Sequence, residues 1–158
     1  MGLKIRKAKI DDLKAFVSIY KSAYQNMQEY AYRKERNIKY YFKWLFRRDR
    51  EGLFVAEIDE KPVGFVACDA YWHSFFDESI GEIHEIVVAK EYKGRGIGKK
   101  LMEVAEEYLK SKGYKKIELW VGERNHTARK FYEKLGYKAG EKFGKWVRMM
   151  KNIARERS

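Results

Sequence analysis

A glycine-rich loop carries the residue types and spacing that point most directly to chemistry. It reads Lys93-Gly94-Arg95-Gly96-Ile97-Gly98 and is followed by Lys99 and Lys100. Glycines let the backbone approach a ligand closely, and the N-terminus of a helix presents free N–H groups at the positive end of the helix dipole. We expect this loop to bind an anion, the pyrophosphate of a coenzyme. A flexible turn with ordinary basic solvation is the alternative.

The spacing of the glycines excludes two other phosphate-binding loops. A P-loop needs Gly-Lys-Ser/Thr after a four-residue gap, and no such sequence occurs here. The dinucleotide-binding fingerprint belongs to repeated strand–helix–strand units, whereas the glycines at positions 94, 96 and 98 alternate in a chain without that repeat.

The elements that must position this loop follow from hydrophobic periodicity. Strands are predicted over residues 3–8, 53–58, 62–71, 82–89, 116–121 and 145–150. Helices are predicted after a cap at Asp11 or Asp12, after a cap at Asn37, from the glycine loop to just before Gly113, and over residues 126–135 with Asn125 as cap. The order β-α-α-β-β-β-α-β-α-β indicates a mixed α/β fold, with one sheet and helices against it. Uneven spacing of the apolar residues in 82–89 predicts a β-bulge there.

Length and composition limit the classes of function. The 158 residues suit one domain, residues 1–158, and the net charge of +12 favours an anionic partner. Basic residues are scattered rather than clustered, which is typical of a solvated surface and makes nucleic acid an unlikely partner. The single Cys68 and the absence of a long apolar run indicate a cytoplasmic protein without a membrane segment. Glutamine occurs only at Gln25 and Gln28 among many charged residues, a bias of proteins from hot environments.

Two blocks of sequence carry a family resemblance. Residues 87–102 contain the glycine loop, and residues 125–137 form a later helical block that begins with Asn125 and includes Tyr132. Together they resemble the GNAT superfamily of acetyltransferases, except that Lys93 stands where the family usually has Gln or Arg. The resemblance implies a mainly antiparallel central sheet with helices on both faces, and acetyl-CoA as the cofactor. It places the cofactor contacts at Ile86, Val87, Val88, Lys93, Gly94, Arg95, Gly96, Ile97, Gly98, Lys99, Asn125 and Tyr132.

The resemblance also implies transfer of acetyl to a primary amine by direct attack in a ternary complex. The amine must lose a proton to attack, and Glu82, His84 and Glu85 lie on the strand before the loop. We favour Glu82 and then Glu85 as the general base, and solvated strand charges are the alternative. The Tyr132 phenol is expected to protonate the departing thiolate, with simple packing as its alternative.

The acceptor amine is expected near two polar, aromatic stretches, residues 24–36 and 71–78. Their aromatic residues could form a pocket or could pack the loops together; they are Tyr30, Tyr32, Trp72, His73, Phe75 and Phe76. Acidic residues that could attract an amine are Glu29, Glu35, Asp77 and Glu78. Two rival functions remain open, a basic nucleic-acid-binding module and a GNAT domain that binds acetyl-CoA without turnover. A homodimer is also left open, and Cys68 is the weakest candidate nucleophile.

Overall fold

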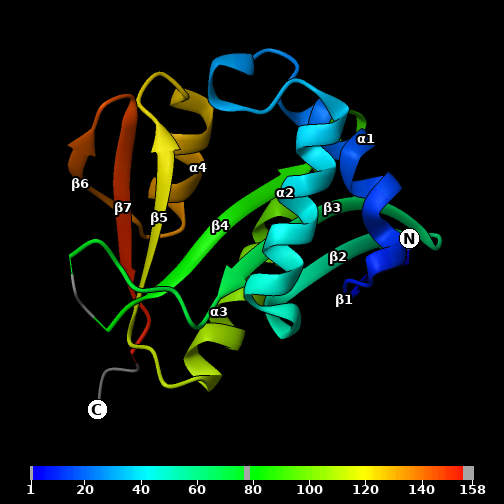
Figure 1. Ribbon diagram of the computed structural model, residues 1–158. Helices are drawn as coiled ribbons and strands as arrows, with labels where there is room; N and C mark the ends of the chain where they lie inside the picture. Colours follow the sequence, from blue (N-terminus) through cyan, green and yellow to red (C-terminus); the bar gives the residue numbers. More distant parts are fainter. Residues whose placement is uncertain (1, 77–78, 155–158) are drawn as a thin grey trace.

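Seven strands form one sheet in the computed structural model, which describes residues 2–76 and 79–154 (Figure 1). The sheet order is β1-β2-β3-β4-β5-β7-β6, and within the described chain every neighbouring pair is antiparallel except the parallel pair β4 and β5. The strands are β1 Leu3–Lys7, β2 Leu53–Ile58, β3 Lys61–Asp69, β4 Gly81–Val88, β5 Lys116–Gly122, β6 Lys138–Phe143 and β7 Trp146–Asn152. The helices are α1 Leu13–Ala23, α2 Glu35–Arg48, α3 Ile97–Ser111 and α4 His126–Lys134.

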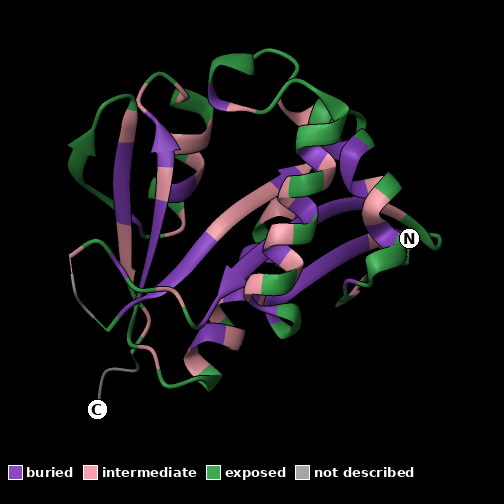
Figure 2. Ribbon diagram, viewed as in Figure 1, coloured by how far each residue is buried: buried purple, intermediate pink, exposed green. Residues whose placement is uncertain are grey.

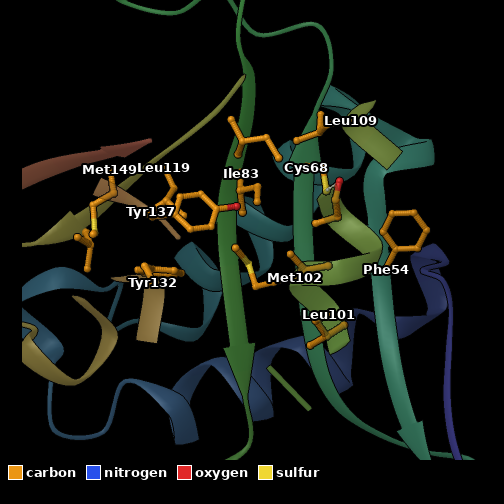
Figure 3. Close-up of a cluster of buried hydrophobic side chains, with 14 of the residues drawn as sticks. Phe54, Cys68, Ile83, Leu101, Met102, Leu109, Leu119, Tyr132, Tyr137 and Met149 are labelled. Atoms are coloured by element: carbon orange, nitrogen blue, oxygen red, sulfur yellow. Dashed lines mark hydrogen bonds between the residues drawn. The ribbon is translucent and has the colours of Figure 1, made fainter. Parts of the chain in front are cut away.

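The helices cover both faces of the sheet, as the family resemblance implies. One buried cluster joins α1 and α2 to the sheet through residues such as Phe16, Phe42 and Phe65. The other cluster joins α3 and α4 to the opposite face and includes Leu101 and Met102 (Figure 3). Strands with both faces covered bury nearly every residue, which Figure 2 shows along β2 and β3.

Two details of the sequence prediction are wrong. The strand β6 was not predicted, because all six of its residues are exposed and it lacks an apolar alternation. It is held by backbone pairing with β7 at the edge of the sheet. The second helix begins at Glu35 with Lys34 at its N-cap, so Asn37 lies inside the first turn and does not cap it. The observed order is therefore β-α-α-β-β-β-α-β-α-β-β.

The described helices do not include a membrane span. Over residues 2–76 and 79–154, none is both long enough and apolar enough to cross a bilayer.

Candidate functional site

The parallel strands β4 and β5 separate after a short region of pairing. Their only registered pairs in the described chain are Gly81 with Ile117 and Glu82 with Glu118, although both strands continue (Figure 1). The rest of β4 therefore has no strand partner on the β5 side. Ala89 donates its N–H to the Val63 carbonyl on β3.

Hydrogen-bonding direction alternates along β4. Ala89 bonds to β3, so Val87, two residues earlier, also directs its backbone N–H and C=O toward β3. The N–H and C=O groups of Ile86 and Val88, which alternate with these residues, point away from β3. Ile86 and Val88 thus present backbone donors and acceptors on the unpaired side of β4, where the sequence predicts cofactor contacts. The geometry does not support a backbone contact from Val87 on that side.

The β-bulge predicted in β4 is present. Cys68 on β3 pairs with Ile83 and Ala67 pairs with Glu85, so His84 is the extra residue. Without the bulge, Ile83 and Glu85 would project from the same face of the sheet. Instead Ile83 packs in the cluster with α3, while Glu85 meets tyrosines from the α1 and α2 side.

Glu85 is held by two phenol groups. The Tyr24 hydroxyl donates to Oε2 of Glu85, and the Tyr41 hydroxyl donates to Oε1 at 2.9 Å. Burial raises the pKa of Glu85 to about 7, against the opposing effect of these two hydrogen bonds and of the Ile86 backbone. A carboxyl group with this pKa exchanges its proton near neutral pH, which suits a general base.

Glu82 has a different environment. Its side chain is 3% exposed, and its Oε1 has no hydrogen-bond partner among the described residues. Burial, a hydrogen bond with Glu118 and the negative charge of Glu118 together raise the pKa of Glu82 to about 11. Glu82 is therefore protonated at neutral pH and cannot accept a proton there. This finding counts against Glu82 as the first choice for the general base.

The partners of Glu82 form a buried polar cluster. Glu118 is fully buried, and its Oε1 accepts hydrogen bonds from the Arg148 guanidinium and from Ser74 Oγ, the latter at 3.2 Å. Arg148 also lies 3.3 Å from Glu141. These groups brace the point where β4 and β5 still pair, which favours a structural role for Glu82. Its use as the general base stays a prediction.

His84 lines the same face as Glu85 and is oriented by an aspartate. Its Nε2 lies 2.8 Å from Oδ2 of Asp69, which is also bound by Arg48 Nε at 2.7 Å. Burial opposes ionisation of Asp69, but the hydrogen bonds from His84 and Arg48 outweigh it and lower the pKa of Asp69 to about 2. The rings of Trp44 and Trp72 pack edge-on against the imidazole at 5.0 and 4.8 Å.

Tyr132 lies on α4, on the other side of the sheet. It packs beside Tyr137 with ring centroids 5.9 Å apart (Figure 3). Its hydroxyl has no hydrogen-bond partner among the described residues, whereas the Tyr137 hydroxyl donates to Glu106 at 2.8 Å. Burial and the charge of Glu85 raise the pKa of Tyr132, so its phenol stays protonated and available as a proton donor.

The glycine loop leads directly into α3. Gly94 and Gly96 both have φ of 80°, a conformation that favours glycine, and a Cβ added at either would meet no atom within 4 Å. Gly96 is the N-cap of α3 and no side chain caps this end, so the first N–H groups of the helix are free of side-chain partners. Lys93 and Arg95 are exposed and have no carboxylate partner in the described part of the chain. These features fit a pyrophosphate group.

Gly98 in the loop and Asn125 before α4 have structural roles of their own. A Cβ added at Gly98 would lie 3.2 Å from the Phe131 ring, so Gly98 permits close packing of α3 on α4. Asn125 caps α4, because its Oδ1 accepts from the Ala128 N–H at 3.2 Å. The cap was predicted from the sequence, and the contact of Asn125 with pantetheine remains a prediction.

An aromatic groove lies between α2 and the bulge of β4. Its volume is about 410 Å³. The residues that line it are Tyr32, Asn37, Tyr40, Tyr41, Trp44 and His84. We call the space that these six residues line the aromatic groove. Tyr41 connects it to Glu85 through the hydrogen bond described above.

The aromatic stretches predicted to surround the acceptor divide into two groups. Tyr32 lines the groove and Trp72 packs behind it on Trp44 with centroids 6.1 Å apart. By contrast, the Tyr30 ring packs on Trp146 at 5.3 Å, and Phe75 packs on Phe143 at 5.1 Å. The second group packs the two stretches against β6 and β7, so it serves packing and not the groove.

Glu29 and Glu35, the predicted acidic residues that the structure describes, do not line the groove. Glu35 lies 3.8 Å from Lys39, and the backbone carbonyl of Glu29 accepts a hydrogen bond from Lys145. Asp77 and Glu78 lie outside the described residues. Cys68 is buried, and burial raises the pKa of its thiol, which disfavours the thiolate needed of a nucleophile.

Comparison with known proteins decides the family. The profile of the Acetyltransferase (GNAT) family matches residues 13–137. The chain belongs to the GNAT acetyltransferase family. An uncharacterized N-acetyltransferase of Archaeoglobus fulgidus is 51% identical over 131 residues, which cover 82% of this GNAT chain and 89% of that protein. An uncharacterized N-acetyltransferase of Methanocaldococcus jannaschii is 45% identical over 150 residues, which cover 94% of this chain and 66% of that protein.

Solved structures agree with this assignment. The crystal structure of PH1933 from Pyrococcus horikoshii matches this GNAT chain with a TM-score of 0.88 and 38% identity, over 98% of this chain and 100% of the other. The PaiA N-acetyltransferase of Thermoplasma acidophilum, crystallised with coenzyme A, has a TM-score of 0.81 and 23% identity over 97% and 100% of the two chains. The second likeness shows the shared fold.

Sequence reasoning missed several residues of this GNAT site. Tyr41 was not singled out, yet it binds Glu85 and lines the groove. Asp69 was not singled out, although it holds His84. An aspartate inside an apolar strand is a signal that could have identified it, because buried carboxylates need partners.

Proposed function

We propose that this GNAT domain transfers the acetyl group of acetyl-CoA to a primary amine by direct attack, with Glu85 as general base and Tyr132 as general acid. The observation that carries the proposal is the position of Glu85, which lies at the bulge beside the unpaired part of β4 and accepts hydrogen bonds from Tyr24 and Tyr41. Burial there raises its pKa to about 7. The charge of Glu85 also contributes to the raised pKa of Tyr132, so the two side chains lie within electrostatic range of each other.

Different parts of the site would bind different parts of acetyl-CoA. Acetyl-CoA supplies the thioester when bound. The uncapped end of α3 and the glycine loop would hold its pyrophosphate, with Lys93, Arg95 and Lys99 adding positive charge. On the β5 side of β4, the N–H of Val88 is suited to the pantetheine arm or to the thioester oxygen, on which negative charge develops, whereas the Ile86 N–H stabilises the Glu85 carboxylate.

The proton transfers balance between the two side chains. The amine nitrogen forms a bond to the acetyl carbon, and the bond from that carbon to sulfur breaks. Glu85 takes the proton that the amine nitrogen loses, and Tyr132 gives its phenol proton to the departing thiolate. Each side chain then recovers its starting state by exchange with solvent.

The test measures release of free thiol from acetyl-CoA with a panel of amines. The panel contains peptide N-termini, lysine peptides, polyamines and aminoglycosides. We expect amine-dependent release, and a loss of about 10²-fold or more in kcat for Tyr132→Phe with little change in the KM for acetyl-CoA. Binding of acetyl-CoA without release by any amine would favour a domain that binds the coenzyme without turnover. Salt-sensitive binding of RNA or DNA, with no stabilisation by acetyl-CoA, would favour the nucleic-acid module.

The proposal also includes the cellular compartment and the oligomeric state. We place the protein in the cytoplasm, where acetyl-CoA is present, and allow a homodimer. Size-exclusion chromatography with light scattering measures the oligomeric state directly.

A further inference from the structure

The aromatic groove has a composition that selects a class of amine. We propose that the acceptor is a primary monoamine that carries an aromatic or bulky apolar group, and that this group lies in the aromatic groove. The inference rests on the proposed acetyltransferase function, whose acceptor is otherwise unspecified. It concerns the six groove residues defined above.

The groove lies within one side chain of the proposed base. Tyr41 forms part of its wall and donates its hydroxyl to Glu85 at 2.9 Å. His84, the extra residue of the bulge, forms another part of the wall and precedes Glu85 in the sequence. A substituent in the groove would therefore leave its amine beside Glu85.

The walls of the groove offer ring surfaces. Tyr32 packs on Tyr41 with centroids 5.2 Å apart, and Trp44 stacks on Tyr41 at 6.2 Å. At the mouth, Tyr32 and Tyr40 are 51% and 66% exposed, so much of each ring is open to a ligand. A volume of about 410 Å³ is near the small end of the range for ligand pockets, roughly 300 to 1,000 Å³. Such a site suits one ring or one branched side chain.

The charges around the groove disfavour a second cation. None of the described residues that line it is acidic. The Arg47 guanidinium lies 5.8 Å from the Tyr40 ring, and that of Arg48 lies 5.4 Å from the Trp72 ring behind Trp44. Arg47 lies against a ring of the groove and would repel a second ammonium group, whereas Arg48 is paired with Asp69 and adds little net charge. Polyamines are therefore expected to be poor acceptors.

Two sources could supply the same chemistry, a free aralkylamine or a peptide whose first residue is aromatic. The experiment compares phenylethylamine, ethylamine, spermidine, a Phe-Gly-Gly peptide and a Gly-Gly-Gly peptide by thiol release. We expect kcat/KM at least about tenfold higher for phenylethylamine than for ethylamine or spermidine, the factor expected from burying one ring. The ratio of the free amine to the Phe-Gly-Gly peptide then tells which source is preferred.

Variants localise the effect. Tyr40→Ala is expected to raise the KM for phenylethylamine about threefold or more and to leave the KM for acetyl-CoA unchanged. Tyr71→Ala is the matched control, because Tyr71 is 60% exposed and does not line the groove. It is expected to change neither constant. Equal or better acetylation of ethylamine or spermidine, or equal effects of the two variants, would overturn the inference.

A binding measurement separates failure of this inference from failure of the proposed function. With coenzyme A in place of acetyl-CoA, phenylethylamine is titrated against tryptophan fluorescence, since Trp44 forms part of the wall. Saturable quenching that Tyr40→Ala weakens supports the groove even if no amine is acetylated. Acetylation of many amines without such quenching refutes the groove and leaves the acetyltransferase function standing.

Discussion

The hydrogen bond between Tyr41 and Glu85 gives a prediction about the pH dependence of the reaction. If Glu85 is the general base, it must be ionised to act, so kcat/KM should rise with pH through an apparent pKa of about 7. Tyr41→Phe removes a donor to the carboxylate, at 2.9 Å from Oε1, and leaves the ring in place. The pKa of Glu85 should therefore rise further.

The size of this rise follows from the strength of the lost bond. A hydrogen bond to a charged group contributes about 1.5 to 3 kcal/mol, and one pKa unit corresponds to about 1.4 kcal/mol. We expect a shift of about one unit, since Tyr24 and the Ile86 backbone still stabilise the carboxylate. At pH 7 the ionised fraction of Glu85 would fall from about one half to about one tenth, and kcat/KM would fall about fivefold. Above about pH 9 the variant and the wild type should be nearly equal.

The assay measures kcat/KM between pH 5.5 and 9.5 with an amine of low pKa, so that titration of the substrate does not obscure that of the enzyme. Glu85→Gln should lower kcat/KM by about 10²-fold or more and abolish the acidic limb. Glu82→Gln is the matched control, because Glu82 has a pKa of about 11 and is already neutral over this range. Its profile should keep the wild-type midpoint.

Three results would refute this reasoning. An acidic limb that persists in Glu85→Gln would show that another group is the base. Loss of the acidic limb of the kcat/KM profile in Glu82→Gln would show that Glu82 is the general base. A Tyr41→Phe profile that is scaled down at every pH, without a shift of its midpoint, would mean that Tyr41 acts only through packing.

Three further predictions concern binding and stability. Gly96→Ala should weaken acetyl-CoA binding about tenfold or more in calorimetry, because its positive φ is strained for alanine and its Cβ would enter the open space of the proposed pyrophosphate site. Gly113→Ala carries the same backbone strain outside the loop and should bind normally. Gly122→Ala should cost about 1 to 3 kcal/mol in the free energy of unfolding, because its Cβ would lie 2.3 Å from the Tyr30 ring, and adding Tyr30→Ala should remove most of that penalty. The raised pKa of Glu82 means that its contribution to stability is full below about pH 4.5 and is lost as pH rises toward about 11. The free energy of unfolding should thus fall by at most about 1.4 kcal/mol per pH unit from pH 5 to 9, and Glu82→Gln should flatten that slope in urea titrations. Normal coenzyme binding by Gly96→Ala would contradict the pyrophosphate site at the loop. Full stability of Gly122→Ala would contradict the close packing of Tyr30 on Gly122. A slope that is unchanged in Glu82→Gln would contradict the raised pKa of Glu82.

Local sequence patterns were sufficient for much of the fold. The amphipathic pattern after the glycine loop predicted α3, and Asn125 predicted the start of α4, because capping and periodicity act within a few residues. The uneven apolar spacing of residues 83–88 predicted the bulge for the same reason. The exposed edge strand β6 has no such pattern, since its pairing depends on β7.

The general base could not be chosen from the sequence. Glu82 and Glu85 lie three residues apart on one strand and have the same side chain, so the local sequence does not distinguish their abilities to accept a proton. Their environments come from distant segments. Glu82 meets Glu118 from β5, whereas Glu85 meets Tyr24 and Tyr41 from the α1 and α2 side.

The sequence by itself determined the family, the glycine loop and the order of most elements, because these depend on motifs and on short-range periodicity. Only the tertiary structure decided which carboxylate titrates near neutral pH and which aromatic residues form a groove. Burial and the approach of charges set a pKa, and both depend on residues far apart in the chain, such as Tyr41 and Glu85. The groove likewise joins Tyr32 and His84, which the sequence places in separate segments.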